Sequence, residues 1–155
     1  MIRVLFVCCG NTCRSPMAES VFTHMVKERG LEKDFFIRSS GTSSKSVGNS
    51  PSYGTVSKLD TEGIHLVPHR ARQMSNWDYS DYDYLIAMDS ANVHNMKKIC
   101  GGDPEGKIHL LLEFTGSVRD IADPYYTRDY DTAFNDISLG LKGFLQYLLT
   151  VESSQ

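Results

Sequence analysis

Apolar and polar residues fall in alternating blocks along the chain, and these blocks predict strands and helices in turn. Residues 2–8 are almost continuously apolar and rich in β-branched side chains, which is typical of a strand buried on both faces of a parallel sheet. After a short loop, apolar residues recur at helical spacing from 17 to 26, and Gly30 indicates the end of that helix. Ser15 before Pro16 predicts the helix start, with Ser15 as the N-cap. The pattern therefore opens with a strand, a tight loop and a helix.

The same order of elements repeats more weakly along the rest of the chain. Further strands are predicted at residues 35–41, 84–88 and 108–112, with a short additional strand at 64–67. A loop rich in Ser, Gly and Asn over about 41–52 precedes a helix that ends at Gly63, and another helix is predicted at 90–99. The last helix has one apolar face, formed by Phe134, Ile137, Leu141, Phe144, Leu145 and Leu148. We therefore predict an α/β fold, a single domain over residues 1–155 built as a three-layer sandwich, in which helices flank a central four-stranded parallel sheet.

Composition and charge exclude several classes of protein. With 155 residues, 41% apolar residues and a net charge of −3, the chain is expected to fold rather than remain disordered. No apolar run approaches the roughly 18 residues of a membrane span, so we expect no membrane partner. Four cysteines are too few for a secreted disulfide scaffold, and we expect a cytoplasmic location. Basic residues form no cluster, which argues against nucleic-acid binding.

The most informative chemistry lies in the loop after the first strand. Cys8 ends that strand, where open α/β sheets bind ligands, and Arg14 stands at the mouth of the following helix. A loop of this size that closes on a helix N-terminus can point several backbone N–H groups at a tetrahedral oxyanion. We expect Gly10 and Asn11 to supply the unusual backbone angles that this requires. The Arg14 guanidinium can hold two phosphate oxygens, so the segment is predicted to be a phosphate-binding loop.

The same environment bears on the reactivity of Cys8. A helix N-terminus and a nearby cation commonly lower the pKa of a thiol, and the Ser15 hydroxyl could also donate to the sulfur. A thiolate beneath a phosphate is a nucleophile aimed at phosphorus. Other readings of the loop fit less well, because it lacks the lysine of a Walker A motif, the glycines of a dinucleotide site and the second ligand pair of a zinc site. We therefore expect no metal and no cofactor.

At this point the sequence resembles a known family. Residues 7–19 look like the signature of low-molecular-weight protein tyrosine phosphatases. The resemblance continues, in the family's order and over nearly the whole chain, through residues 39–43, 69–73, 88–89 and 123–126. It implies Cys8 as nucleophile, Arg14 as phosphate clamp and Asp123 as general acid and base. The chemistry agrees, because a phenol with a pKa of about 10 leaves more easily when an acid protonates it, and Pro124 favours extended backbone at Asp123.

The resemblance also implies the remaining site residues. Phosphate would be bound by Cys9, Gly10, Asn11, Thr12, Cys13, Arg14 and Ser15. A buried polar network supporting the loop would comprise Asn11, Ser15, Ser39, His69 and Asp89, with Asp89 paired to His69. The substrate cleft would be formed by Thr12, Lys45, Tyr125 and Tyr126. By the same resemblance, Cys13 could form a reversible disulfide with Cys8 that protects the nucleophile from irreversible oxidation. Cys9 would either compete as the redox partner or simply fill space, and we favour the second, with Cys100 structural.

Two positions depart from the family pattern and leave the substrate open. Thr12 resembles the threonine of the related protein arginine phosphatases, whereas Tyr125-Tyr126 is unlike those enzymes. Lys45 stands near the place where tyrosine phosphatases commonly present an aromatic wall, which suggests a shallower, more electropositive entrance and an acidic peptide substrate. We favour phosphotyrosine over phosphoarginine. A thioredoxin-coupled arsenate reductase would need two further downstream cysteines, and a non-catalytic phosphoprotein-binding module would not need a nucleophile and a proton donor together.

The expected partners follow from this function. The substrate would be a phosphotyrosine-containing protein, for which a tyrosine kinase is one candidate. Inorganic phosphate and other oxyanions would act as competitive ligands, because the same loop would bind them. The protein itself is expected to be a monomer or a weak dimer.

Overall fold

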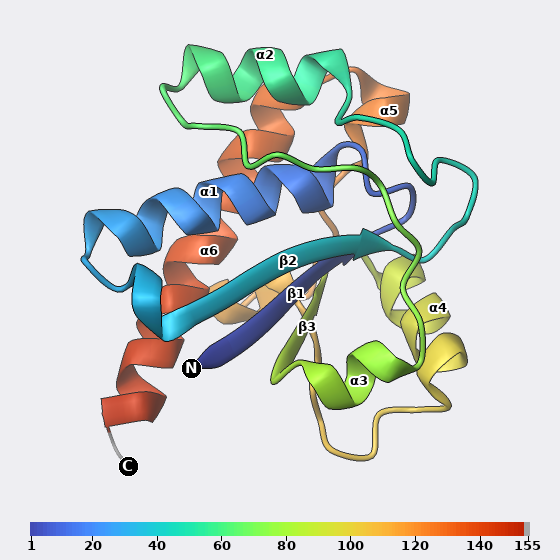
Figure 1. Cartoon of the computed structure of the whole chain (residues 1–155), viewed down its shortest axis with the longest axis vertical. Helices are drawn as coiled ribbons and strands as arrows, with labels where there is room; N and C mark the ends of the chain where they lie inside the picture. The colour runs from blue at the N-terminus through green and yellow to red at the C-terminus, as the bar shows by residue number, and fades with distance from the viewer. Residues whose placement is uncertain (154–155) are drawn as a thin grey trace.

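Four parallel strands form the centre of the computed structural model, which describes residues 1–153 (Figure 1). The order across the sheet is β2 (Phe35–Gly41), β1 (Ile2–Cys8), β3 (Tyr84–Ala87) and β4 (Ile108–Leu110). Because the chain leaves β1 toward β2 on one side and later returns to β3 on the other, the strand order reverses at β1. Open sheets of this kind bind ligands at the carboxyl edge beside such a reversal.

Helices cover both faces of the sheet. They are α1 (Arg14–Glu28), α2 (Tyr53–Thr61), α3 (Trp77–Asp81), α4 (Ser90–Cys100), α5 (Pro124–Thr127) and α6 (Tyr130–Ser153), with short 3-10 turns η1 (Glu32–Asp34) and η2 (Leu111–Thr115). Figure 1 places α1 and α6 on one side of the sheet and α3 and α4 on the other. The predicted three-layer α/β sandwich with a four-stranded parallel sheet is therefore confirmed.

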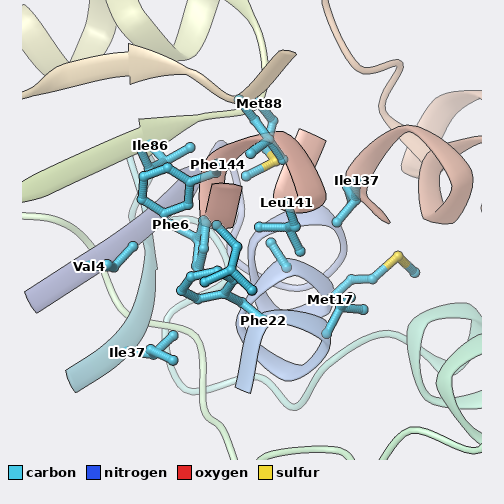
Figure 2. Close-up of a cluster of buried hydrophobic side chains, with 14 of the residues drawn as sticks. Val4, Phe6, Met17, Phe22, Ile37, Ile86, Met88, Ile137, Leu141 and Phe144 are labelled. Carbon is cyan, nitrogen blue, oxygen red and sulfur yellow. The ribbon is translucent and has the colours of Figure 1, made fainter. Parts of the chain in front are cut away.

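Successive side chains of β1 enter two separate hydrophobic clusters, as the alternation of a strand requires. Val4 and Phe6 point into the larger cluster, between the sheet and α1 and α6, where the Phe6 ring meets Phe22 and Phe144 edge-on (Figure 2). Leu5, Val7 and residues of β3 enter the smaller cluster with α3 and α4. Burial on both faces explains why residues 2–8 are almost continuously apolar.

Three sequence predictions about secondary structure are wrong, one about the existence of a strand and two about boundaries. Residues 64–67 form no strand, because this extended segment lies against the α1 side of the core, with the Val67 N–H donating to the Ser20 hydroxyl. The fourth strand ends at Leu110, and Leu111 and Leu112 are buried in the 3-10 turn η2. Ser15 is not an N-cap: the N-cap of α1 is Cys13 and the helix begins at Arg14, two residues earlier than predicted, and the Ser15 hydroxyl contacts the Cys8 sulfur. In the described part of the chain, no helix is long and apolar enough to cross a membrane.

Candidate active site

A cavity of about 270 Å³ opens at the carboxyl end of β1. Its walls come from the loop after β1, from the loop after β2 and from the start of α5. The lining residues are Cys8, Cys9, Gly10, Thr12, Cys13, Ser43, Lys45, Ser46, Asp123, Tyr125 and Tyr126. The cavity thus brings together residues that are more than a hundred positions apart in the sequence, including the predicted nucleophile and the predicted proton donor.

The loop between β1 and α1 is tightly folded against the end of β2. Asn11 has a left-handed backbone with φ of 59°, as expected, whereas Gly10 does not, so only one of the two predicted positions needs that conformation. The N–H groups of Thr42 and Ser43 donate to the carbonyls of Cys8 and Cys9 at 2.9 and 3.0 Å. A side chain at Gly41 would collide with the Cys9 carbonyl. Glycine at the end of β2 therefore permits the close approach that shapes the loop.

The Asn11 side chain holds this loop from within, because all four of its hydrogen-bonding positions are used. Its amide nitrogen donates to the hydroxyls of Ser15 at 2.8 Å and Ser39 at 3.1 Å. Its oxygen accepts from the Arg72 backbone N–H at 3.0 Å and contacts His69 Nε2 at 2.8 Å. Since the Arg72 N–H can only donate, the shared Asn11 oxygen is an acceptor, and His69 Nε2 must carry the proton toward it. Four of the five residues predicted for a supporting network therefore lie in one connected group.

Glu19 completes this group, although the sequence reasoning gave it no role. Its carboxylate accepts from the Ser39 hydroxyl at 2.6 Å, and its Oε1 lies 3.7 Å from His69 Nδ1. Burial raises the pKa of Glu19 and lowers the pKa of His69, so both groups are driven toward their neutral forms. One signal could have identified it, because Glu19 lies one helical turn after Ser15 and so faces the same side of α1.

The Cys8 sulfur lies in a buried pocket of hydrogen-bond donors. The Ser15 hydroxyl is 2.9 Å from the sulfur, and the backbone N–H groups of Ser15 and Asn11 also point to it. Burial raises the pKa of the Cys8 thiol, whereas the Arg14 charge and these donors lower it, and burial is the larger effect. The net shift of the Cys8 pKa is therefore opposite to the lowering expected from the sequence, because burial outweighs the effects of Arg14 and the hydrogen-bond donors.

Arg14 is not among the residues that line the cavity, but its charge acts on Cys8 and Asp123, which do line it, and only 2% of its surface is exposed. One terminal nitrogen donates to Asp89 and to the Ile121 carbonyl, both at 2.7 Å, and the other lies 3.4 Å from Asp123. Burial would lower the pKa of Arg14, but the neighbouring Cys8, Asp123 and Asp89 raise it, so the side chain stays cationic. Among residues 1–153, the buried Arg14 Nε has no hydrogen-bond partner. The guanidinium therefore retains one unused hydrogen-bond donor.

The predicted pair between Asp89 and His69 is wrong. Asp89 follows β3 and binds Arg14, whereas His69 belongs to the segment that runs beside the end of β2, where Gly41 pairs with Gln73. Because β1 lies between β2 and β3, the two side chains are on opposite sides of the loop. Asp89 also caps α4, since its carboxylate accepts from the Asn92 N–H.

Asp123 and the two following aromatic residues form one wall of the cavity. Asp123 has extended backbone, as Pro124 predicts, and its carboxylate accepts from the Tyr125 N–H at 3.0 Å. The rings of Tyr125 and Tyr126 meet edge-on at 5.0 Å and are 62% and 78% exposed. These aromatic faces are therefore available to a ligand that enters the cavity.

Lys45 lines the same cavity, and the other lining residues from its own loop are Ser43 and Ser46. Its side chain is exposed, and within residues 1–153 its ammonium takes part in no ion pair. Thr12 lines the cavity as well and lies next to Cys13 in the loop. The entrance thus combines one cation and the hydroxyls of Thr12, Ser43 and Ser46 with the two tyrosines.

The four cysteines occupy different environments, and all are free thiols. Cys13 is buried, donates to the Ser52 hydroxyl at 3.3 Å and lies 3.6 Å from the Tyr130 hydroxyl, two contacts that sequence reasoning missed. Cys9 is exposed, so it does not fill space in the loop as expected. Cys100 is half-buried against the smaller hydrophobic cluster. In the part of the chain that the structure describes, no three His, Cys, Asp or Glu side chains are grouped so as to hold a metal ion.

Comparison with known proteins assigns the family. The model of "Low molecular weight phosphotyrosine protein phosphatase" matches residues 3–153. The low molecular weight protein-tyrosine-phosphatase YfkJ of Bacillus subtilis is 39% identical over 147 residues, which cover 94% of both chains. The crystal structure of YfkJ matches with a TM-score of 0.93 and 38% identity, covering 97% of this chain and 96% of that one. The low molecular weight phosphotyrosine protein phosphatase of Schizosaccharomyces pombe is 41% identical over 151 residues, covering 96% of this chain and 95% of the relative. The crystal structure of a Drosophila arginine phosphatase has a TM-score of 0.85 and 34% identity, covering 94% of this chain and 96% of that one. The chain belongs to the low molecular weight phosphotyrosine protein phosphatase family.

Proposed function

We propose that the protein hydrolyses phosphotyrosine in proteins through a phosphocysteine intermediate. The observation that carries this proposal is the buried Arg14, whose unpartnered Nε lies in the same site as the Cys8 sulfur and the Asp123 carboxylate. A buried cation with a free donor fits a phosphoryl group, and a sulfur surrounded by donors can serve as its nucleophile. Membership of a phosphatase family supports the same chemistry.

The reaction has two displacement steps. In the first, the Cys8 thiolate attacks phosphorus, the bond from phosphorus to the tyrosyl oxygen breaks, and Asp123 gives a proton to the departing phenolate. In the second, the Asp123 carboxylate takes a proton from water as that water attacks the phosphocysteine, and the sulfur leaves as thiolate. Arg14 and the loop N–H groups balance the charge on the phosphoryl oxygens in both steps.

The polar group around Asn11 supports these steps without contacting the substrate. Asn11, Ser39, His69 and Glu19 fill the space beneath the loop and connect to Ser15, which contacts the nucleophile. We infer that this group fixes the direction of the loop N–H groups before the substrate arrives. Such preorganisation lowers the barrier because the donors need not reorient during the reaction.

The shape and charge of the entrance favour a phosphotyrosine within an acidic sequence. Tyr125 and Tyr126 can pack against a phenyl ring. The unpaired Lys45 lies where a carboxylate next to the phosphotyrosine could reach it. We infer that the physiological substrates are cytoplasmic phosphoproteins, such as a tyrosine kinase, and that inorganic phosphate and other oxyanions compete for the site.

Phosphoarginine is the second candidate substrate, and Thr12 is the observation that favours it. Thr12 lines the cavity with its hydroxyl-bearing side chain, and one structural relative is named an arginine phosphatase. The same catalytic steps apply, with a phosphorus–nitrogen bond in place of the phosphorus–oxygen bond. The exposed pair Tyr125 and Tyr126 supports phosphotyrosine as the main substrate.

The proposal is tested with purified protein and two substitutions. Wild-type protein should hydrolyse aryl phosphates in the presence of a metal chelator. Cys8→Ser should abolish turnover while leaving phosphate binding largely intact, and Asp123→Ala should lower kcat/KM for tyrosyl phosphate by about 10²-fold or more but much less for an ester of an acidic phenol. Undiminished turnover in Cys8→Ser, or equal losses on both substrates in Asp123→Ala, would overturn the assigned roles.

Substrate choice is tested by comparing rates on matched phosphotyrosine and phosphoarginine peptides. Wild-type protein should prefer the phosphotyrosine peptide. Thr12→Ile should increase that preference if Thr12 contributes to phosphoarginine recognition. An unchanged ratio would remove Thr12 as a specificity determinant, and a wild-type preference for phosphoarginine would reverse the order of the two candidates.

A further inference from the structure

A residue without an assigned role anchors the loop that carries Asp123. The Asp120 carboxylate accepts hydrogen bonds from the backbone N–H of Ser90 at 2.9 Å and from the Ser90 hydroxyl at 3.1 Å. Ser90 is the first residue of α4, and the first N–H groups of a helix have no partner within the helix. Asp120 therefore fastens its own loop to the start of α4, three residues before the proposed proton donor.

The point of attachment is the junction between β3 and α4, residues 88–90. The Met88 carbonyl accepts from the Ile121 N–H at 3.0 Å, and the Ile121 carbonyl accepts from Arg14 at 2.7 Å. Asp89, in the same junction, binds Arg14 at 2.7 Å. The junction therefore holds the phosphate clamp on one side and the loop of the proton donor on the other.

The loop that carries Asp123 is also bonded to α6, on the side away from α4. Arg119 makes two parallel hydrogen bonds to the Asp136 carboxylate on α6, at 3.0 and 2.8 Å. Ile121 is 1% exposed and anchors the middle of the loop in the core. Of these three anchoring residues, Asp120 is the one whose side chain binds residues 88–90, the junction that also binds Arg14. Asp120 is therefore suited to set the position of Asp123 relative to the phosphoryl group.

We propose that Asp120 is a positioning residue for the proton donor Asp123. This inference rests on the proposed function, because it assigns Asp120 to the step in which the leaving group is protonated. Loss of the Asp120 carboxylate would free the loop from α4 and let Asp123 move away from the bridging oxygen. Its effect should therefore depend on how much the leaving group needs a proton.

The test compares kcat/KM for a phosphotyrosine peptide with kcat/KM for a phosphate ester of an acidic nitrophenol. Asp120→Ala should lower the first by about tenfold and the second by less than about threefold. Asp120→Asn keeps an oxygen that accepts from the Ser90 N–H and should restore most of the loss. Ser90→Ala removes one of the two hydrogen bonds and should fall between wild type and Asp120→Ala.

Two controls separate positioning from a general structural effect. Asp103→Ala removes a comparable set of hydrogen bonds, to Tyr79, Lys107 and Ile108, at the opposite edge of the sheet, and should leave the ratio of the two substrates unchanged. In an Asp123→Ala background, Asp120→Ala should have no further effect on phosphotyrosine hydrolysis, because the group that it positions is absent.

The outcomes distinguish this inference from the proposed function. If Asp123→Ala shows the expected dependence on the leaving group but Asp120→Ala lowers both substrates equally, or lowers phosphotyrosine hydrolysis further in the Asp123→Ala background, the positioning role is wrong. If Asp123→Ala itself shows no dependence on the leaving group, the assignment of the proton donor fails, and with it this inference.

Discussion

Arg14 is buried and forms an ion pair of 2.7 Å with the partly buried Asp89, and each partner also makes a second contact. Arg14 also donates to the Ile121 carbonyl, and Asp89 also caps α4 through the Asn92 N–H. The pair therefore connects the phosphate-binding loop to a helix on the other face of the sheet. Substituting Asp89 should affect both stability and chemistry, and the two effects can be separated.

Asp89→Ala should lower the free energy of unfolding by about 1 kcal/mol, because the cap of α4 is lost. It should also lower kcat/KM by about tenfold or more, because Arg14 loses a partner that directs it. Asp89→Asn can still cap the helix, so it should recover the stability but only part of the activity. Urea denaturation and steady-state kinetics measure the two effects. Full activity in Asp89→Ala would show that Arg14 needs no such partner.

Ser15→Ala should raise the pKa of Cys8 further, because the thiolate loses the hydroxyl that lies 2.9 Å away. Less thiolate is then present at any given pH, so alkylation of Cys8 at neutral pH should slow by about tenfold. The rate of alkylation by iodoacetamide is measured at several pH values by mass spectrometry of the Cys8 peptide, and its pH dependence gives the pKa of Cys8. Ser39→Ala is the matched control, because that hydroxyl contacts Asn11 and Glu19 but not the sulfur. A Cys8 titration that responds equally to both substitutions would contradict the direct contact.

Gly41→Ala should destabilise the protein by about 1–3 kcal/mol and weaken phosphate binding, because its Cβ would collide with the Cys9 carbonyl. Gly10→Ala is the contrasting variant in the same region, since its Cβ would lie 3.5 Å from the Ser46 hydroxyl, an ordinary contact. Its stability should stay within about 0.5 kcal/mol of wild type. Thermal unfolding with and without phosphate measures both. Similar losses in the two variants would mean that space at Gly41 does not shape the loop.

The stability of the protein should fall as the pH drops below the ordinary pKa of histidine, about 6.5, in part because of His69. Burial lowers the pKa of His69 in the folded protein, so the unfolded chain binds a proton there before the folded one does. His69→Gln removes this difference in proton binding, so the unfolding free energy of the variant should decline less between pH 7.5 and 5.5 than that of wild type. Urea denaturation at several pH values compares the two proteins, with Glu19 present in both. Parallel pH dependences would contradict the prediction.

Peroxide should inactivate the enzyme reversibly through a disulfide between Cys8 and Cys13. Cys13→Ser should lose recovery on addition of dithiothreitol, because Cys8 then oxidises past the sulfenic acid. Cys9→Ser is the control and should recover like wild type. The fraction of activity regained after a fixed exposure measures the effect. Recovery that depends on Cys9 instead would assign the redox role to the exposed thiol.

The sequence predicted the fold well where burial alone determines the pattern. Residues 2–8 are apolar on both faces because helices cover both faces of β1, and that signal is local. The strand prediction failed at Leu111 and Leu112, which are buried in a 3-10 turn, with Leu111 packed closely against Gly140 of α6. Two consecutive leucines are expected both in a buried strand and in a buried 3-10 turn. The sequence pattern alone therefore could not show that these two are buried against α6 and do not extend the strand.

The site was predictable to the extent that its residues are close in sequence. The loop from Cys8 to Ser15 carries its chemistry in one short stretch, whereas the partner of Asp89 depends on strand order. Only the arrangement of β2, β1 and β3 shows that Asp89 faces Arg14 and not His69. The contact between Cys13 and Tyr130 likewise joins the end of the phosphate-binding loop to the start of α6, and nothing in the local sequence indicates it.

The junction of β3 and α4 has a mechanical consequence. A phosphoryl transfer needs one group on the non-bridging oxygens and another on the bridging oxygen, at a spacing set by the substrate. Arg14 and the loop of Asp123 are both hydrogen-bonded to residues 88–90. The spacing between the phosphate clamp and the proton donor is therefore set at this one junction, and not by the long stretch of chain that separates the two residues in the sequence.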